Sequence, residues 1–382
     1  MVPENVQIDG LLAAALGPEK VAWPFPCDPG TVETVLKLID YHGIAGLLFK
    51  RLGSLESWPQ DLRLAVGERA KTHAMWELRH RHELTTFLEL LADGAIPALL
   101  LKGSALAYDL YDNPAHRVRG DTDVLIRNED VRAVRRLLTD LSFERLAEGT
   151  ELPDELRAQE SWIHIAQDGS RHVIDLHWRV LNAPALHALF PFARVWNGRR
   201  PLPQLSAAAF APHRSILLAH ACVHRAFHKC SPYFVGGHTY FGGDRLIWLW
   251  DIALLSRSLS ETDWDEFTQV AIETGLGPSI EEGLASAQSY FDFPLPARVG
   301  AEVKQAGSNS YLNSGQFGRA VRDWWAVQGP RSKAEYTFRR LLPTGQFMRA
   351  KYAGAAERPL PLLYLRRMGE FIRARPTRSQ SR

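Results

Sequence analysis

Two acidic side chains at the entrance of a buried strand restrict the fold of this chain more than any other feature. Asp121 and Asp123 are followed at once by the apolar run Val124-Leu125-Ile126. Residues i and i+2 of a strand project from the same face, so the two carboxylates point to one location. Like charges this close repel each other unless a cation compensates them. The pattern predicts a strand over 122–126 that begins beside a divalent cation.

A third carboxylate is expected on a neighbouring strand. The segment 172–178 alternates apolar and polar residues, as a strand does, and contains Asp175. Mg²⁺ (or Mn²⁺) is bound by a few carboxylates together with water and substrate phosphates, and two such ions can activate both the attacking and the leaving oxygen. An isolated D-x-D is most often a solvated strand end. In this context, however, we predict that Asp121, Asp123 and Asp175 are both the metal ligands and the catalytic residues.

A turn upstream of these acids has the features of a phosphate site. The apolar run 96–101 reads as a buried strand, and Lys102-Gly103-Ser104 then opens a helix. Backbone N–H groups and the helix dipole at such a turn favour an anion. We therefore predict nucleotide contacts from Lys102, Gly103, Ser104 and Arg117. The alternative is an ordinary turn, with Ser104 as helix cap and the two cations on the surface.

The order of elements predicts an α+β fold. Strand, helix, strand, helix and strand follow one another within a core that we assign to residues 93–205. Helical periodicity predicts an N-terminal helical region over 1–92 and a C-terminal one over 206–365. Glycines at 236–237 and 242–243 indicate a flexible loop, and the arginine-rich segment 366–382 is predicted to be a disordered tail.

Polar side chains within the C-terminal helical region need partners. His220, His224 and His228 share one face of a predicted helix, where they are expected to line a pocket or pack in the core. A structural zinc site is the weaker reading, because Cys222 falls on another face. Asp251 lies in an apolar segment, where a carboxylate is costly unless paired. We expect it to pair with Arg245 or with one of the histidines.

These motifs together resemble a known family. The segment Leu101-Lys102-Gly103-Ser104, the Asp121-Thr122-Asp123 strand and the strand of Asp175 look like those of the bacterial "uncharacterised nucleotidyltransferase" family of the polymerase-beta-like superfamily. The helical segments around His220 and Arg245 also resemble that family, so the likeness covers roughly residues 30 to 350. It implies a small mixed sheet with helices, flanked by helical regions. It also implies that the three acids bind metal and that Gly103 and Ser104 contact a triphosphate.

The predicted activity is Mg²⁺-dependent transfer of a nucleotidyl group from an NTP to a hydroxyl or amine acceptor, which would be a small molecule, a peptide or RNA. In this reading Asp121 and Asp123 hold both metals, and Asp175 binds the nucleophile-side metal and assists deprotonation. Two alternatives stay open. One is kinase-like phosphoryl transfer to a peptide or small molecule, and the other is a non-catalytic nucleotide- or partner-binding module.

Composition sets further limits. With 46% hydrophobic and 23% charged residues among 382, a folded core is expected, and a net charge of +2 argues against a strongly electrostatic partnership with nucleic acid or membrane. The basic tail leaves contact with RNA open. Three cysteines imply no disulfide framework, so we expect a reducing cytoplasm. We expect neither a secretory signal nor a membrane partner, and the oligomeric state stays open.

Overall fold

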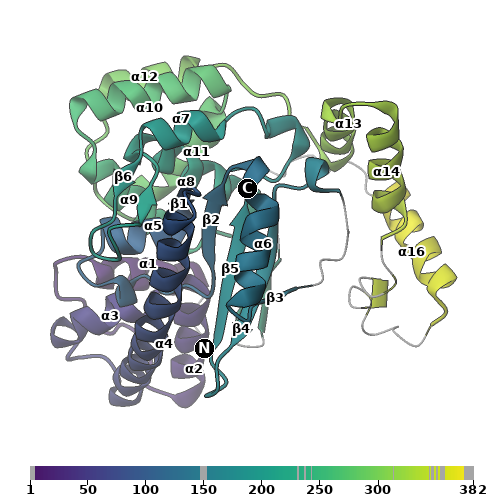
Figure 1. Ribbon diagram of the computed structural model, residues 1–382. Coiled ribbons are helices and arrows are strands. Elements are labelled where there is room, and N and C mark those ends of the chain that lie inside the picture. The colour runs from purple at the N-terminus through teal and green to yellow at the C-terminus, as the bar shows by residue number, and fades with distance from the viewer. Residues whose placement is uncertain are drawn as a thin grey trace.

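A five-stranded mixed sheet lies among helices in the computed structural model, which has an α+β architecture (Figure 1). The structure describes residues 5–146, 153–229, 232–235, 238–241, 243–312, 314–343, 345, 348–349, 352 and 358–373. The strands of the sheet follow the order β1-β2-β5-β4-β3. Their bounds are β1 (Ala98–Leu100), β2 (Thr122–Ile126), β3 (Glu144–Arg145), β4 (Gln159–Ile165) and β5 (Arg171–His177).

The two strands that carry the acids are central and run in the same direction. β2 pairs in parallel with β5, whereas β1 and β4 pair antiparallel to β2 and β5, respectively. Val124, Leu125 and Ile126 are buried, as a continuous apolar run predicts for a strand covered on both faces. The predicted strands at 122–126 and 172–178 are therefore confirmed, the second with a shift of one residue.

Helices precede and follow the sheet. Before it come α1 (Asn5–Leu16), α2 (Pro29–His42), α3 (Ala45–Arg51) and α4 (Gln60–Asp93), and within it α5 (Lys102–Asp109) and α6 (Val131–Asp140). After it come α7 (Phe192–Asn197), α8 (Arg214–His228), α9 (Leu246–Ser258), α10 (Glu261–Thr274), α11 (Gly277–Gln288), α12 (Ala297–Gln305), α13 (Gln316–Ala326), α14 (Pro330–Leu341) and α16 (Leu360–Arg373). Two small hairpins pair β6 (Arg200–Pro201) with β7 (Phe210–Ala211), and β8 (Pro232–Val235) with β9 (His238–Phe241).

Local sequence signals set both ends of α2, a helix beside the site. Asp28 caps α2 by accepting a hydrogen bond from the Thr31 amide at 3.0 Å, and Pro29 occupies the first turn. Gly43 ends the helix with φ of 69°, in the left-handed region that suits glycine. The same chemistry bounds α10, whose first turn carries a capping box.

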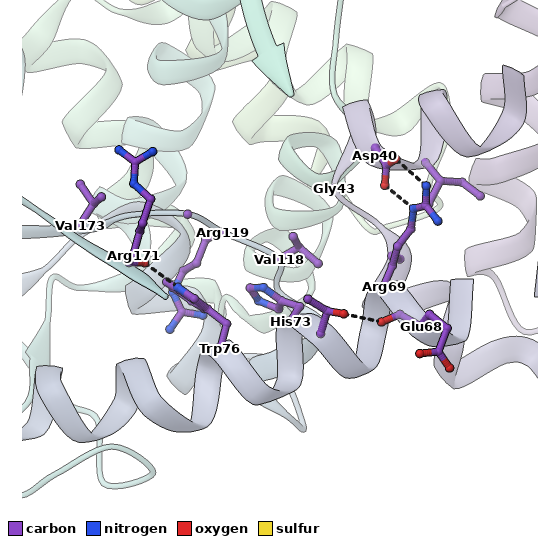
Figure 2. A pocket seen from close by; sticks show the side chains of 14 residues that line it. Asp40, Gly43, Glu68, Arg69, His73, Trp76, Val118, Arg119, Arg171 and Val173 are labelled. Carbon is purple, nitrogen blue, oxygen red and sulfur yellow. Dashed lines mark hydrogen bonds and ion pairs between the residues drawn. The ribbon is translucent and has the colours of Figure 1, made fainter. Parts of the chain in front are cut away.

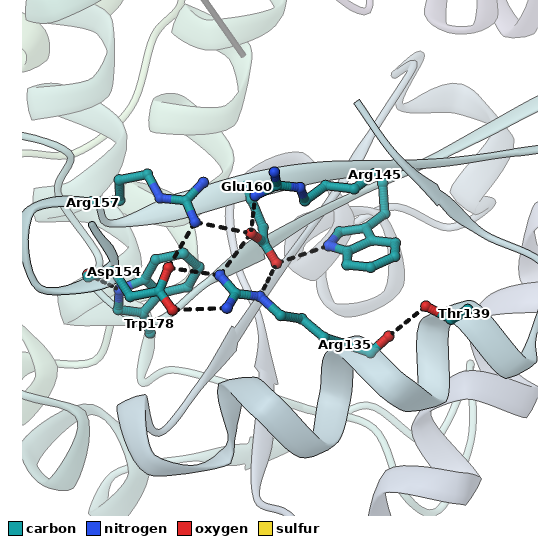
Figure 3. A network of polar contacts seen from close by, with 8 residues as sticks. Arg135, Thr139, Arg145, Asp154, Arg157, Glu160 and Trp178 are labelled. Carbon is teal, nitrogen blue, oxygen red and sulfur yellow. Dashed lines mark hydrogen bonds and ion pairs between the residues drawn. The ribbon is translucent and has the colours of Figure 1, made fainter. Parts of the chain in front are cut away.

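A buried carboxylate ties β4 to α6 (Figure 3). Glu160 is fully buried, and both of its oxygens accept hydrogen bonds at 2.8 Å from the guanidinium of Arg135 on α6. Arg157 lies 3.2 Å from the same carboxylate, and the Trp162 indole donates to it at 3.1 Å. The arginines thus satisfy a charge that the interior would otherwise exclude.

One hydrophobic cluster joins the helices and the sheet. It reaches from Ile8 in α1 to Tyr311, so the N-terminal helices, the sheet and α8 to α12 share a core. Helices α13, α14 and α16 lie to the side (Figure 1), where Val327 and Tyr336 pack on Leu156. No helix in the described stretches is long and apolar enough to cross a membrane.

Two segments predicted from the sequence, the flexible loop and the C-terminal tail, can be compared with the observed secondary structure. The loop predicted to be flexible holds the β8–β9 hairpin, while positions 236, 237 and 242 lie outside the described residues. The segment predicted to be a tail from residue 366 begins inside α16, because the helix continues to Arg373. The rest of that segment, 374–382, also lies outside the described residues.

Candidate functional site

Strand register brings two acids side by side. Asp123 on β2 is the direct partner of Asp175 on β5, so their side chains leave the same face of the sheet at neighbouring positions. Asp121 lies one residue before β2. Because residues two apart on an extended chain project from the same face, it shares the face of Asp123. On β4, Ser161 stands opposite Asp175 and donates a hydrogen bond to its Oδ1 at 2.6 Å. Adjacent strands therefore build the cluster.

Asp123 is held by a lysine and a histidine. The Nζ of Lys102 and the Nε2 of His177 lie 2.5 and 2.8 Å from its Oδ1. Burial alone would raise the pKa of Asp123, but Lys102 and His177 outweigh it and hold that pKa well below its ordinary value. Burial would likewise lower the pKa of Lys102, yet attraction to Asp123 raises it. Asp123 is thus an anion with a permanent cation beside it.

The negative charges of the other two carboxylates are only partly compensated by nearby cations. The pKa of Asp121 is raised to about 6, first by burial of the carboxylate and then by repulsion from Asp123 and Asp175. Burial and the charge of Asp123 also raise the pKa of Asp175, although the bond from Ser161 opposes this. An additional positive charge at this point would favour the ionised form of both acids.

Side chains on β2 and β5 form a group that could bind a metal ion. Among the residues that the structure describes, one set of three His, Cys, Asp or Glu side chains brings its ligand atoms within 4.8 Å of one another, and it consists of Asp123, Asp175 and His177. Asp121 stands beside this group at the more exposed end of β2 and is not a member of it. The set can hold a divalent cation.

Lys102 reaches Asp123 from an unusual backbone position. Its φ of 49° lies in the left-handed region, which a residue with a side chain adopts at a cost of order 1–3 kcal/mol. Such strain is typical of functional sites, where the surrounding structure fixes a side chain that the chain alone would place elsewhere.

Gly103 and Ser104 occupy the predicted turn, each with a specific packing role. A Cβ on Gly103 would lie 3.0 Å from the guanidinium carbon of Arg117, so the absence of a side chain lets the arginine approach. The Ser104 hydroxyl is buried and donates to the Thr122 hydroxyl at 3.1 Å. Any contact of Ser104 with a ligand would therefore come from its backbone amide.

Arg117 is the partner of Asp251. Its Nη2 lies 2.7 Å from Oδ2 of Asp251, and the Tyr111 hydroxyl donates to Oδ1 at 2.7 Å. The expectation that a histidine of α8 would pair with Asp251 is wrong, because Arg117 binds the carboxylate. Burial raises the pKa of Asp251, and the charges of Arg117 and, more weakly, Arg245 oppose this rise. Arg245 also donates a hydrogen bond to the backbone carbonyl of Tyr41.

The acids open into a cavity of about 480 Å³, and a second cavity of about 540 Å³ adjoins it. Both are lined by Lys102, Asn182, His224 and His228, and His220 lines the second. Burial lowers the pKa of His220 to about 3 and that of His224 well below its ordinary value, so both are neutral at pH 7. The predicted pocket-lining role of these histidines is confirmed. Their polar rings and Lys102 suit a ligand with many oxygen atoms.

Comparison with known families agrees with this geometry. The sequence model described as "uncharacterised nucleotidyltransferase" matches residues 28–292, which include the sheet, the acids and helices α8 to α11. The chain belongs to this nucleotidyltransferase family. No curated protein matches it.

The candidate site includes side chains that the sequence analysis did not select, and His177 is the one that contacts Asp123. His177 lies two residues after Asp175 on β5, so it shares the face of the acids. That spacing was visible in the sequence. What the sequence did not show is the parallel register of β2 and β5, which puts the imidazole 2.8 Å from Asp123.

Proposed function

We propose that the protein is a metal-dependent nucleotidyltransferase with a polymerase-beta-like core, which moves a nucleotidyl group from an NTP to a hydroxyl or amine acceptor. One observation carries the proposal. Asp123 and Asp175 are direct neighbours on parallel strands, in a cavity also lined by Lys102, Gly103 and Arg117, within a chain of the nucleotidyltransferase family. Acids and cations that meet in one cavity suit a metal-bound triphosphate.

The side chains present fit a divalent cation. Burial, and after it repulsion from Asp123, raises the pKa values of Asp121 and Asp175, and the charge of Lys102 only partly opposes this rise. Carboxylate oxygens are the ligands that Mg²⁺ and Mn²⁺ prefer. We propose Asp121, Asp123 and Asp175 as the metal ligands, with His177 orienting Asp123 by the hydrogen bond at 2.8 Å. Bound there, the cation would neutralise phosphate oxygens and make the acceptor oxygen easier to deprotonate.

The other residues of the cavity are assigned to the nucleotide. Lys102 and Arg117 supply positive charge, and the amides of Gly103 and Ser104 at the start of α5 supply donors for phosphate oxygens. The bond between Arg117 and Asp251 fixes the guanidinium against Gly103, so its position exists before a ligand arrives. In this division residues 93–205 carry the chemistry, and 206–365 contribute the histidine-lined wall.

The proposed reaction is a nucleophilic substitution at the α-phosphorus of the NTP. The acceptor oxygen or nitrogen attacks the α-phosphorus, a new bond forms there, and the bond to the β-phosphate bridging oxygen breaks to release pyrophosphate. The acceptor proton passes to Asp175 as the new bond forms. Water replaces the acceptor in a slow hydrolysis of the same NTP.

Labelled ATP tests the proposal. The protein is incubated with Mg²⁺, a mixture of alcohols and amines, and ATP labelled at either the α- or the γ-phosphate. Nucleotidyl transfer moves the α-label to the acceptor and releases pyrophosphate, and Asp123→Asn and Asp175→Asn abolish both. Transfer of the γ-label alone would identify the phosphoryl-transfer alternative. ATP binding that does not depend on Mg²⁺, without release of either product, would identify a non-catalytic module.

A further inference from the structure

Formal charge divides this chain into two unequal parts. Residues 313–382 contain 15 of its 45 Lys and Arg residues but only 4 of its 43 Asp and Glu residues, so they carry +11. Residues 1–312, which include the sheet and the acids of the site, carry −9. The net charge of +2, which argued against a membrane partner, is the average of these opposite parts and conceals both.

Within residues 1–312 acids outnumber cations and hold many of them. In the cavity between α2 and α4, for example, Arg69 donates two hydrogen bonds to Asp40, at 2.7 and 3.0 Å (Figure 2). In residues 313–382, by contrast, at most four of the 15 cations can be matched by an acid of the same segment. This segment therefore keeps a large excess of positive charge.

The basic segment also exposes many apolar side chains. Among the residues whose burial the structure describes, 18 large hydrophobic residues are exposed, and nine of these lie in or directly after α13, α14 and α16. The three helices stand to the side of the main body (Figure 1). Since the segment is less than a fifth of the chain, exposed apolar residues are concentrated in it. They are Phe317, Val321, Trp325, Phe338, Leu341, Leu342, Leu362, Leu365 and Met368.

Helix α13 carries its exposed apolar residues on one face. Phe317, Val321 and Trp325 follow one another at intervals of four, which is about one helical turn. Nζ of Lys333 lies 4.8 Å from the centroid of the Trp325 ring. Tryptophan is enriched at the boundary between water and lipid, because its ring is apolar and its N–H is polar.

Helix α16 buries one apolar side and exposes another. Leu363 is buried and packs with Met348 and Tyr352. Leu362 and Leu365, by contrast, are 52% and 64% exposed. Contiguous apolar surface of this kind is rare on a protein that has no partner there.

Basic and apolar side chains on the same helices indicate the surface of an anionic lipid bilayer. Helices of this type lie in the headgroup layer, where lipid phosphates attract the cations and the apolar faces leave water. RNA would match the charge, but six of the nine exposed side chains have no ring on which a base stacks. A second copy would offer its negative part, yet the nine exposed hydrophobic residues of that part are distributed over 312 positions.

We propose that α13, α14 and α16 bind the surface of a membrane that contains anionic lipid. The binding is peripheral, because α16 has 14 residues and, at about 1.5 Å per residue, is shorter than the roughly 30 Å of a hydrocarbon core. The same lipid repels the part that carries −9, so the sheet and its acids face the water. This inference does not depend on the proposed nucleotidyl transfer.

Cosedimentation with vesicles tests the proposal. Full-length protein is mixed with vesicles of phosphatidylcholine alone, or of equal parts of phosphatidylcholine and phosphatidylglycerol. At about 0.1 M NaCl we expect at least about tenfold tighter binding to the anionic vesicles. Most of this difference should vanish at about 1 M NaCl, where the Debye length falls from about 10 Å to about 3 Å.

A double variant of α16 tests the apolar face. Leu362→Gln with Leu365→Gln keeps the charge and the helix propensity, and should weaken binding to anionic vesicles at least about tenfold. Leu64→Gln with Leu78→Gln is its control, because these leucines lie on α4 and are 60% and 65% exposed. The control should bind as the wild type does. Far-UV circular dichroism checks that each variant is folded.

A second pair of variants tests the charge. Arg358→Gln with Arg366→Gln removes two exposed cations from the basic segment. At about fivefold for each arginine, the affinity for anionic vesicles should fall about 30-fold. Arg132→Gln with Arg136→Gln removes the same charge from exposed positions of α6 and should leave the affinity unchanged.

The outcomes separate lipid from the other partners. Equal binding to neutral and anionic vesicles, or equal losses in the test and control variants, would overturn the proposal. So would binding to bulk tRNA without binding to vesicles, or a wild-type oligomer that Leu362→Gln with Leu365→Gln dissociates in sedimentation while vesicles stay unbound. Asp175→Asn should bind anionic vesicles as the wild type does, so failure of the proposed transfer would leave this inference standing.

Discussion

Removing Asp251 should destabilise the protein strongly, because it leaves a buried guanidinium without its counter-charge. The side chains of Arg117 and Asp251 are 8% and 5% exposed, and Nη2 and Oδ2 lie 2.7 Å apart. Loss of one partner of such a pair typically costs about 3–5 kcal/mol. We expect Asp251→Ala to lower the free energy of unfolding by that amount. Lys304→Ala, which removes a surface ion pair of 3.5 Å, should cost less than about 1 kcal/mol.

The assay is urea unfolding followed by tryptophan fluorescence at pH 7. A double variant, Arg117→Met with Asp251→Leu, removes both charges and fills the space with apolar atoms. It should therefore be more stable than Asp251→Ala alone, since no charge stays buried without a partner. Two results would refute the reasoning: a loss below about 1 kcal/mol for Asp251→Ala, or a double variant less stable than the single one.

Three further predictions concern the cavity and the sheet. Lys102→Met removes the cation beside Asp123 and should weaken MgATP binding about 10- to 100-fold by calorimetry, the value of a charged hydrogen bond; an unchanged Kd would contradict the phosphate role. Gly103→Ala places a Cβ 3.0 Å from the Arg117 guanidinium and should lower the stability by about 1–3 kcal/mol in thermal unfolding, whereas Gly10→Ala, with no atom within 4 Å, should not destabilise. Burial would raise the pKa of Glu160, but its bonds to arginine lower it, so its stabilisation is complete above the unfolded pKa and is lost as the pH falls through the folded one. Urea midpoints between pH 6 and 3 should therefore fall less in Glu160→Gln than in the wild type, and parallel curves would contradict this.

Local patterns predicted the strands of the acids because their residues carry the signal themselves. The apolar run after Asp123 fixes β2 at 122–126, and the alternation around Asp175 fixes β5 to within one residue. Their adjacency is a property of the whole sheet. The proximity of Asp123 and Asp175 was expected because a divalent cation needs carboxylates from more than one strand. The observed register makes them direct partners.

Strand β4 was not predicted, because its sequence does not look like that of a buried strand. Gln159–Ile165 places Glu160 at a fully buried position, where a pattern of hydropathy predicts an apolar residue. Arg135 and Arg157 make this carboxylate acceptable, and both lie outside the strand. The hydropathy of the strand alone does not reveal a buried charge that arginines outside the strand neutralise.

The partner of Asp251 was mispredicted for a related reason. Candidates were sought within its own segment and on α8, but Arg117 lies 134 residues earlier in the chain. A buried carboxylate shows that a partner must exist, and only the tertiary structure shows which cation supplies it.

Anomalous diffraction tests the central claim most directly. Crystals are grown with Mn²⁺ and a non-hydrolysable ATP analogue, and data are collected at the manganese absorption edge. The account predicts an anomalous peak within about 2.5 Å of carboxylate oxygens of both Asp123 and Asp175, with the triphosphate on the side of Gly103. A peak on the histidines of α8 instead, or a bound triphosphate without a peak at these acids, would contradict it.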